Sequence, residues 1–286
     1  MNNATLSNIH NDYDGFNKLI EFYGKYKDDT FETIEINLDT WFDANLSAVL
    51  GGIIDRLNEW NFIEFGTVSP NIQIILKKNR FLAHFGFDDT NDTYHTTIKY
   101  LKLKPTDSRY FSNYVQTELF GRNELPNMSQ EVRKKISESI FEMFVNAQIH
   151  SDTKFIYTCG QFYPQRNEII FTIVDTGVGF AKRIENNLGE KIPSAKAIKW
   201  AITEGHTTKK DTPGGIGLAI LKDFITKNKG KIQIISGNAM YQLDTGGEEY
   251  FDLDSYFDGV IINMVFKTND TTSYHFAEEI DLSELF

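Results

Sequence analysis

The stretch EIIFTIVDTGVGF, residues 168–180, decides the fold of the second half of this chain. Its apolar run predicts a buried strand over 168–175 that ends at Asp175. Gly177 and Gly179 follow directly, and because they carry no Cβ they leave bare backbone beside the carboxylate. A flat polar ring could approach the chain there and donate a hydrogen bond to Asp175. A tight turn alone would also explain this pattern.

A long helix is predicted before this strand, over residues 128–151. One apolar stripe marks its buried face, whereas Glu142, Asn146 and His150 recur four residues apart on another face. Polar residues at this spacing are usually a solvated face. Here apolar neighbours surround the triplet, which favours a partly buried pocket.

A glycine-rich segment, GHTTKKDTPGGIGLAI (205–220), leads into the last predicted helix. Backbone N–H groups at a helix N-terminus suit phosphates, although this segment lacks the GxxxxGK[ST] pattern of a P-loop. The remaining elements predicted for the second half are strands over 154–163, 231–236 and 259–266 and helices over 193–204 and 216–230.

In this order, the three motifs resemble the N box and the two glycine boxes of the GHKL superfamily, which includes gyrase, heat-shock chaperones, histidine kinases and mismatch-repair ATPases. The resemblance covers about residues 125–267. It implies a two-layer α/β sandwich with a mixed sheet on one side and helices on the other. It also implies that ATP binds with Mg²⁺ under a mobile lid, here residues 181–213.

The resemblance assigns roles to single residues. Glu142 matches the general base of gyrase-like ATPases and anti-sigma serine kinases, and Asn146 matches the magnesium ligand. Asp175 matches the acid that accepts from the adenine amine. The implied nucleotide-binding residues are Asn146, His150, Asp175, Gly177, Gly179, Thr207, Thr208, Lys209, Gly214, Gly215, Gly217 and Leu218.

Two features depart from the family pattern. Most members carry Thr after Gly on the last strand, whereas Val260 follows Gly259 here, which would remove a contact worth about 0.5–1.5 kcal/mol. The chain also lacks a helical hairpin with a phosphoacceptor His, so it is not a complete histidine autokinase.

The first half is predicted to be a smaller α/β unit. We expect one helix over residues 1–30, strands over 33–38, 62–66, 71–76 and 98–103, and helices over 44–60 and 77–87, with Asp43 as an N-cap. TIEINLDTWFDANLSAVLGGIIDRL and KKNRFLAHFGF resemble a STAS domain, but Ala44 stands where phosphorylated members carry Ser. An unrelated α/β cap remains the alternative. The expected organisation is a STAS-like regulatory domain (1–104), a linker (105–127) and the ATP-binding domain with an acidic C-terminal stretch (128–286).

Charge and composition exclude several classes of protein. The formal net charge is −11, and residues 241–286 hold eleven acidic residues and one basic residue, Lys267. A basic footprint for nucleic acid or a membrane surface is therefore missing. No apolar run is long enough to span a bilayer and the first residues are polar, so we expect a cytoplasmic protein. The single Cys159 is expected to be a buried, inert thiol, and the six His show no metal-binding spacing.

Two functions follow from these motifs. The first is a regulatory enzyme that hydrolyses ATP or transfers its γ-phosphate to a protein Ser or Thr, with Glu142 as the base. The alternative is a nucleotide-gated protein-interaction module with little or no catalysis. A GHKL dimer clamp is disfavoured, because its transducer domain does not fit after Phe266. A protein partner is expected, and the oligomeric state stays open.

Overall fold

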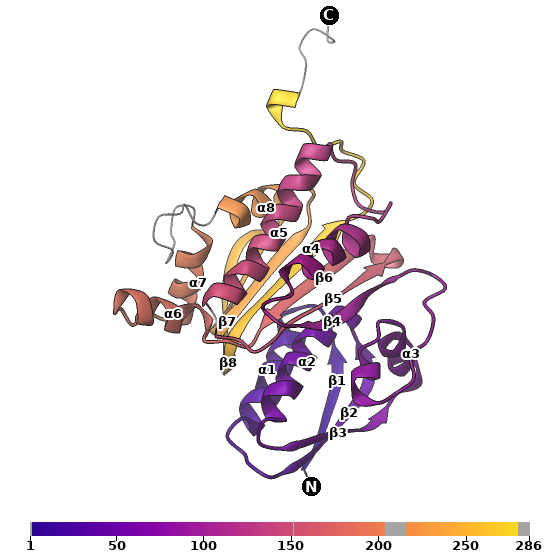
Figure 1. Ribbon diagram of the computed structural model, residues 1–286, viewed down its shortest axis with the longest axis vertical. Helices are drawn as coiled ribbons and strands as arrows, with labels where there is room; N and C mark the ends of the chain where they lie inside the picture. Colours follow the sequence, from indigo (N-terminus) through magenta and orange to yellow (C-terminus); the bar gives the residue numbers. More distant parts are fainter. Residues whose placement is uncertain (1, 151, 204–215, 280–286) are drawn as a thin grey trace, which may run out of the picture.

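The protein is a mixed α/β structure with two sheets (Figure 1). The computed structural model describes residues 2–150, 152–203 and 216–279. One sheet is parallel with strand order β1-β2-β3, and the other has five strands in the order β4-β5-β6-β8-β7. Every strand pair of the five-stranded sheet is antiparallel, so the mixed sheet that the resemblance implied is wrong. Within the described residues, no helix is both long and apolar enough to cross a membrane.

The parallel sheet and its two helices form the N-terminal unit, residues 2–68. Its elements are β1 (Asn2–Ile9), α1 (Tyr13–Tyr26), β2 (Thr33–Phe42), α2 (Ser47–Leu57) and β3 (Phe62–Val68). The helix expected over 1–30 is therefore wrong for its first part, where Ala4, Leu6 and Ile9 are buried strand residues. The helix begins only after Asp12, whose side chain accepts the N–H of Gly15 at 3.0 Å.

The segment after β3 differs from the expected strand. Residues 71–76 lie in helix α3 (Pro70–Lys78), in which Ile72 and Leu76 are buried one turn apart. Pro70 occupies the first turn, where its fixed φ and missing N–H favour a helix start. A short 3₁₀ helix, η2 (Leu82–Phe85), follows within the region expected to be helical.

Residues 97–127 belong structurally to the second sheet. The strand expected at 98–103 is β4 (Thr97–Leu103), which pairs antiparallel with β5 rather than with the N-terminal unit. The range expected to be a linker contains α4 (Ser108–Tyr114) and a π-helical turn, η3 (Val115–Leu119), with Phe111 and Leu119 buried.

The remaining elements follow the predicted order, except that the helix at residues 179–188 was not predicted. These are α5 (Gln130–His150), β5 (Ile156–Tyr163), β6 (Glu168–Asp175), α6 (Gly179–Leu188), α7 (Ser194–Ile202), α8 (Ile216–Lys227), β7 (Lys231–Asp244) and β8 (Gly247–Lys267). The last two strands extend well beyond the predicted ranges and form a long hairpin. Part of the acidic C-terminal stretch is therefore strand, in which carboxylates alternate with inward residues such as Leu253 and Phe257.

Each face of the five-stranded sheet packs against helices. Along β6, Val174 contacts the core shared with α1 and α2, whereas Phe171 and Ile173 contact the core under α4, α5, α7 and α8. The outer part of β8 also reaches α1, where Tyr13 donates to the Asp252 carbonyl at 2.8 Å. The N-terminal unit thus covers the sheet face opposite α5 (Figure 1).

Cys159 lies in the core shared with the N-terminal unit and has no exposed surface. Burial raises the pKa of its thiol to about 12. The predicted burial of the thiol is confirmed. The raised pKa keeps the thiol protonated at neutral pH.

A buried polar network joins the N-terminal unit to the sheet. The Asn45 amide donates to Asn11 at 2.8 Å, to Thr172 on β6 at 3.1 Å and to Asn263 on β8 at 3.3 Å. Asn263 in turn donates to Gln233 on β7 at 2.8 Å. Because each buried group has a partner, the network sets the position of the N-terminal unit on the sheet.

Asp43 extends this junction in a way that differs from its expected role as an N-cap. Its carboxylate makes no cap bond and is fully buried. It accepts two bonds of 3.0 Å from the Arg166 guanidinium and one of 2.8 Å from the Trp41 indole. The buried charge is thus matched by a bidentate partner from the loop between β5 and β6.

Replacing Asn45 with Ala is expected to lower the free energy of unfolding by about 2–4 kcal/mol, because several buried polar groups lose a partner. Urea denaturation measures the change. Asn91→Ala, at an exposed loop position, is the control and is expected to stay within about 0.5 kcal/mol. Equal, small effects of the two substitutions would mean that the network does not stabilise the junction.

Candidate functional site

Helix α5 carries three of the sequence-predicted site residues. Ser129 caps its start by accepting the N–H of Val132 at 3.1 Å. Ile140 and Phe144 are fully buried against the sheet. Glu142 and Asn146 lie one turn apart and are half-buried. His150 ends the helix, and its side chain lies outside the described part of the structure.

Asp175 is the last residue of β6 and is only 5% exposed. Its Oδ1 accepts the N–H of Gly177 at 3.0 Å, which orients the carboxyl group at the strand end. The next residue, Thr176, donates its N–H to the Thr153 hydroxyl at 3.2 Å. The loop after α5 and the end of β6 are therefore tied together at this point.

Two glycines let other backbone segments approach Asp175. A Cβ on Gly259 would lie 2.1 Å from the Asp175 carbonyl oxygen, and one on Gly179 would lie 2.8 Å from the Ser236 hydroxyl. Both glycines also have positive φ, +141° and +70°, which disfavours any side chain there. β8 and α6 can close around the strand end only because of these residues.

Val260 pairs directly with Asp175 between β8 and β6 and is buried. The position after Gly259 therefore lies beside the acid, and Val260 brings no hydroxyl to it.

Arg183 lies near the same carboxylate and was not predicted from the sequence. It lies one turn after Gly179 on the buried face of α6 and is 9% exposed. Burial lowers the pKa of its guanidinium, and the charge of Asp175 opposes that shift. An arginine on the inward face of an amphipathic helix was the available signal.

The phosphate-binding half of the predicted site is described only in part. Leu218 is half-buried on α8 and packs against the core under α5. Gly217 lies in the first turn of α8. Thr207, Thr208, Lys209, Gly214 and Gly215 lie outside the described residues, as does the second part of the expected lid. Its first part contains most of α6 and all of α7.

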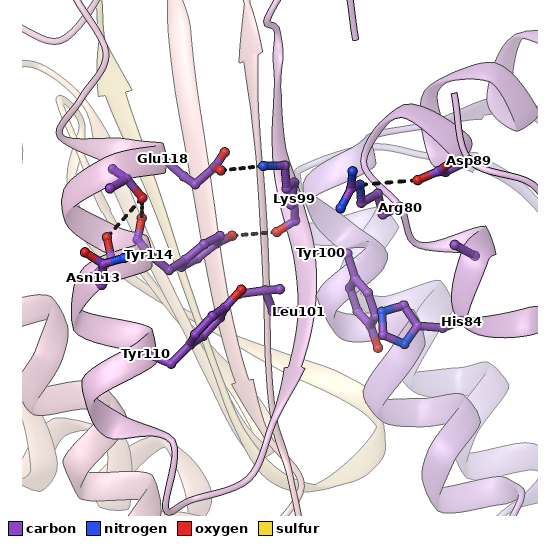
Figure 2. Close-up of a pocket in the computed structure, with 12 residues that line it drawn as sticks. Arg80, His84, Asp89, Lys99, Tyr100, Leu101, Tyr110, Asn113, Tyr114 and Glu118 are labelled. Atoms are coloured by element: carbon purple, nitrogen blue, oxygen red, sulfur yellow. Dashed lines mark hydrogen bonds and ion pairs between the residues drawn. The ribbon is translucent and has the colours of Figure 1, made fainter. Parts of the chain in front are cut away.

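A separate cleft of about 430 Å³ lies between β4, α4 and η2 (Figure 2). Arg80 and Asp89 form an ion pair of 3.5 Å on one side, and Lys99 and Glu118 form one of 2.8 Å on the other. The sequence-predicted site residues within the described structure are not among the residues that line it. Its charged groups are paired with each other, so no ligand is indicated.

The described part of the chain shows no metal site built from several protein ligands. Within residues 2–150, 152–203 and 216–279, no group of three or more His, Cys, Asp or Glu side chains could hold a metal ion.

A comparison with models of known protein families finds no match for this chain, and a comparison with curated proteins finds none either.

Gly259→Ala is expected to lower the free energy of unfolding by about 2 kcal/mol or more, because the new methyl group meets the Asp175 carbonyl and the backbone is strained. Thermal unfolding followed by circular dichroism measures the loss. Gly246→Ala, in the β7–β8 turn, is the matched control, since its Cβ would meet nothing closer than 3.1 Å. A Gly259→Ala melt equal to that of the control would contradict the close approach of β8 to Asp175.

Proposed function

We propose that the chain is a GHKL-type ATP-binding regulatory protein that hydrolyses ATP or transfers its γ-phosphate to a protein Ser or Thr. The observation that carries the proposal is the buried Asp175 carboxyl group at the end of β6, with glycine backbone on either side of it. A carboxylate held this way can accept a hydrogen bond from the exocyclic amine of adenine.

Glu142 and Asn146 support the same proposal from α5. Both are half-buried and face away from the fully buried Ile140 and Phe144. The amide oxygen of Asn146 is the kind of hard ligand that suits Mg²⁺, which keeps most of its other contacts to phosphates and water. Bound Mg²⁺ would supply positive charge near the phosphate oxygens.

Glu142 would act as the general base. It would accept the proton of a water or of a Ser or Thr hydroxyl as that oxygen forms a bond to the γ-phosphorus. The bond from the γ-phosphorus to the bridging oxygen would break, and ADP would carry away the negative charge. Asn146 and Asp175 would position the nucleotide at its two ends.

A nucleotide-gated interaction module is the second candidate function, and the junction with the N-terminal unit favours it. Gly52 on α2 lies against Thr176, the neighbour of Asp175, where a Cβ would meet the Thr176 methyl group at 3.1 Å. On the same helix, Asp55 accepts a hydrogen bond of 2.7 Å from Tyr157. A shift of residues 175 and 176 on nucleotide binding would therefore press on α2, which gives a STAS-like regulatory unit a direct mechanical link.

ATP with Mg²⁺ is expected to stabilise the protein by about 2.7 kcal/mol at a ligand concentration 100-fold above the dissociation constant. This corresponds to a shift of several degrees in a thermal melt. Asp175→Asn is expected to remove most of the shift, because the amide can no longer accept in the same way. Asp89→Asn, in the separate cleft, is the control. An unchanged shift in Asp175→Asn would refute the adenine assignment.

Glu142→Ala is expected to keep nucleotide binding but to lose turnover by about 10²- to 10⁴-fold, the range for a general base. Phosphate release and transfer to candidate partner proteins are the assays. Glu138→Ala, one turn earlier at a residue ion-paired with Lys135, is the matched control and is expected to retain turnover. If the wild-type protein binds ATP but shows neither hydrolysis nor transfer, the interaction module replaces the enzyme.

A further inference from the structure

Three large aromatic side chains stand exposed together on the N-terminal unit. Phe31, Trp60 and Phe62 are 79%, 62% and 64% exposed, and we call them the aromatic patch. The backbone brings them together, because Phe31 donates its N–H to the Trp60 carbonyl at 2.7 Å and Phe62 donates to the Glu32 carbonyl at 2.8 Å. Single apolar residues are normal on surfaces, whereas several exposed rings on adjoining backbone segments indicate an interaction site.

The loops that carry the patch are held by a buried side chain. Asn61 is 5% exposed, accepts the N–H of Glu32 at 3.1 Å and donates to the carbonyl of Asp29 at 2.9 Å. The loop before β2 and the loop before β3 are thereby fixed against each other. The three rings are presented by a rigid support, which reduces the ordering cost of binding.

Two features make phenylalanine an unfavourable residue at position 31 when no partner is bound. Its φ of +61° lies in the left-handed region, which a bulky residue rarely occupies. Its ring is also the most exposed of the three. Asn would fit the backbone and the solvent better at this position, so the local fold does not explain a phenylalanine here. A strained and exposed residue points to function.

The acidic residues around the patch indicate that its partner carries positive charge. Glu35 and Glu64 lie directly opposite each other on β2 and β3, on the open sheet face that Phe62 shares. Like charges placed opposite each other destabilise a sheet. Within the described residues, Glu32, Glu35 and Glu64 have no ion-pair partner. A second copy of this chain or an anionic membrane would bring further negative charge to this face.

We propose that the aromatic patch and the three carboxylates bind a segment of a partner protein that presents apolar side chains flanked by Lys or Arg. The apolar side chains cover Phe31, Trp60 and Phe62, and the cations lie over Glu32, Glu35 and Glu64. Aromatic residues at the centre and charges at the rim are the usual anatomy of such an interface. The proposal does not depend on nucleotide binding.

The test measures binding of a fluorescein-labelled amphipathic peptide of Leu and Lys to the full chain by anisotropy. The double substitution Trp60→Ser with Phe62→Ser is expected to weaken binding by about 10-fold or more. Tyr94→Ser, at a residue 80% exposed outside the patch, is the control and is expected to bind as the wild type does. The double substitution Glu35→Gln with Glu64→Gln is expected to weaken peptide binding. It is also expected to make the affinity for the peptide less dependent on salt concentration.

Phe31→Asn separates binding from folding. It is expected to raise or preserve the melting temperature, because Asn tolerates positive φ, while it weakens peptide binding. The proposal is overturned if the patch variants bind the peptide as the wild type does, or if a Leu and Glu peptide binds equally well. It is also overturned if the patch mediates binding to neutral or anionic vesicles, or if sedimentation shows a patch-dependent dimer instead.

Discussion

Both faces of the five-stranded sheet are covered, α1 and α2 packing on one side and α4, α5, α7 and α8 on the other. A sheet buried on both faces needs apolar residues at successive positions, and β6 meets this need from Ile169 to Val174 with one exception. The exception, Thr172, is completely buried and bonds to Asn45 and Asn263. The N-terminal unit therefore covers one of the two faces of the sheet. Polar groups, and not apolar contacts alone, fix its position there.

Strong periodicity explains what the sequence could predict. β6 spans the predicted residues and α5 lies within the predicted range, because their apolar patterns are long and regular. β1 was missed, since NNATLSNI offers only Ala4, Leu6 and Ile9 as inward residues. NIQIIL has an apolar pattern that also fits a strand, but these residues form α3, which begins at Pro70. These errors come from local ambiguity that tertiary packing resolves.

Only part of the candidate site could be predicted from the sequence. The position of Asp175 at a strand end, with glycines behind it, followed from the sequence. The approach of Gly259 to Asp175 and the burial of Arg183 did not, because they depend on segments far apart in the chain. The Asn45 network lies beyond pattern recognition for the same reason, since its partners are 127 and 218 residues away.

The edge strands differ in whether side chains donate hydrogen bonds to their carbonyl groups. Lys18 donates to the carbonyls of Ser7 and Asn8 at the end of β1. On β4, Tyr114 donates to the carbonyl of Lys99, and Arg122 donates to that of Thr97. Such side chains block the addition of a further strand. In the described structure no side chain donates in this way to β3, the strand that begins with Phe62, so this edge stays accessible beside the aromatic patch.

The contact between α1 and the outer part of β8 has a consequence for synthesis on the ribosome. Tyr13, Asn17 and Tyr23 bond to Asp252, Asp254 and Asp258, which are translated more than 230 residues later. At about 5–20 residues per second, the first helix waits on the order of ten seconds or more before its covering strand emerges. During that interval its apolar face is available to chaperones, and truncated chains that end before β8 would leave it uncovered.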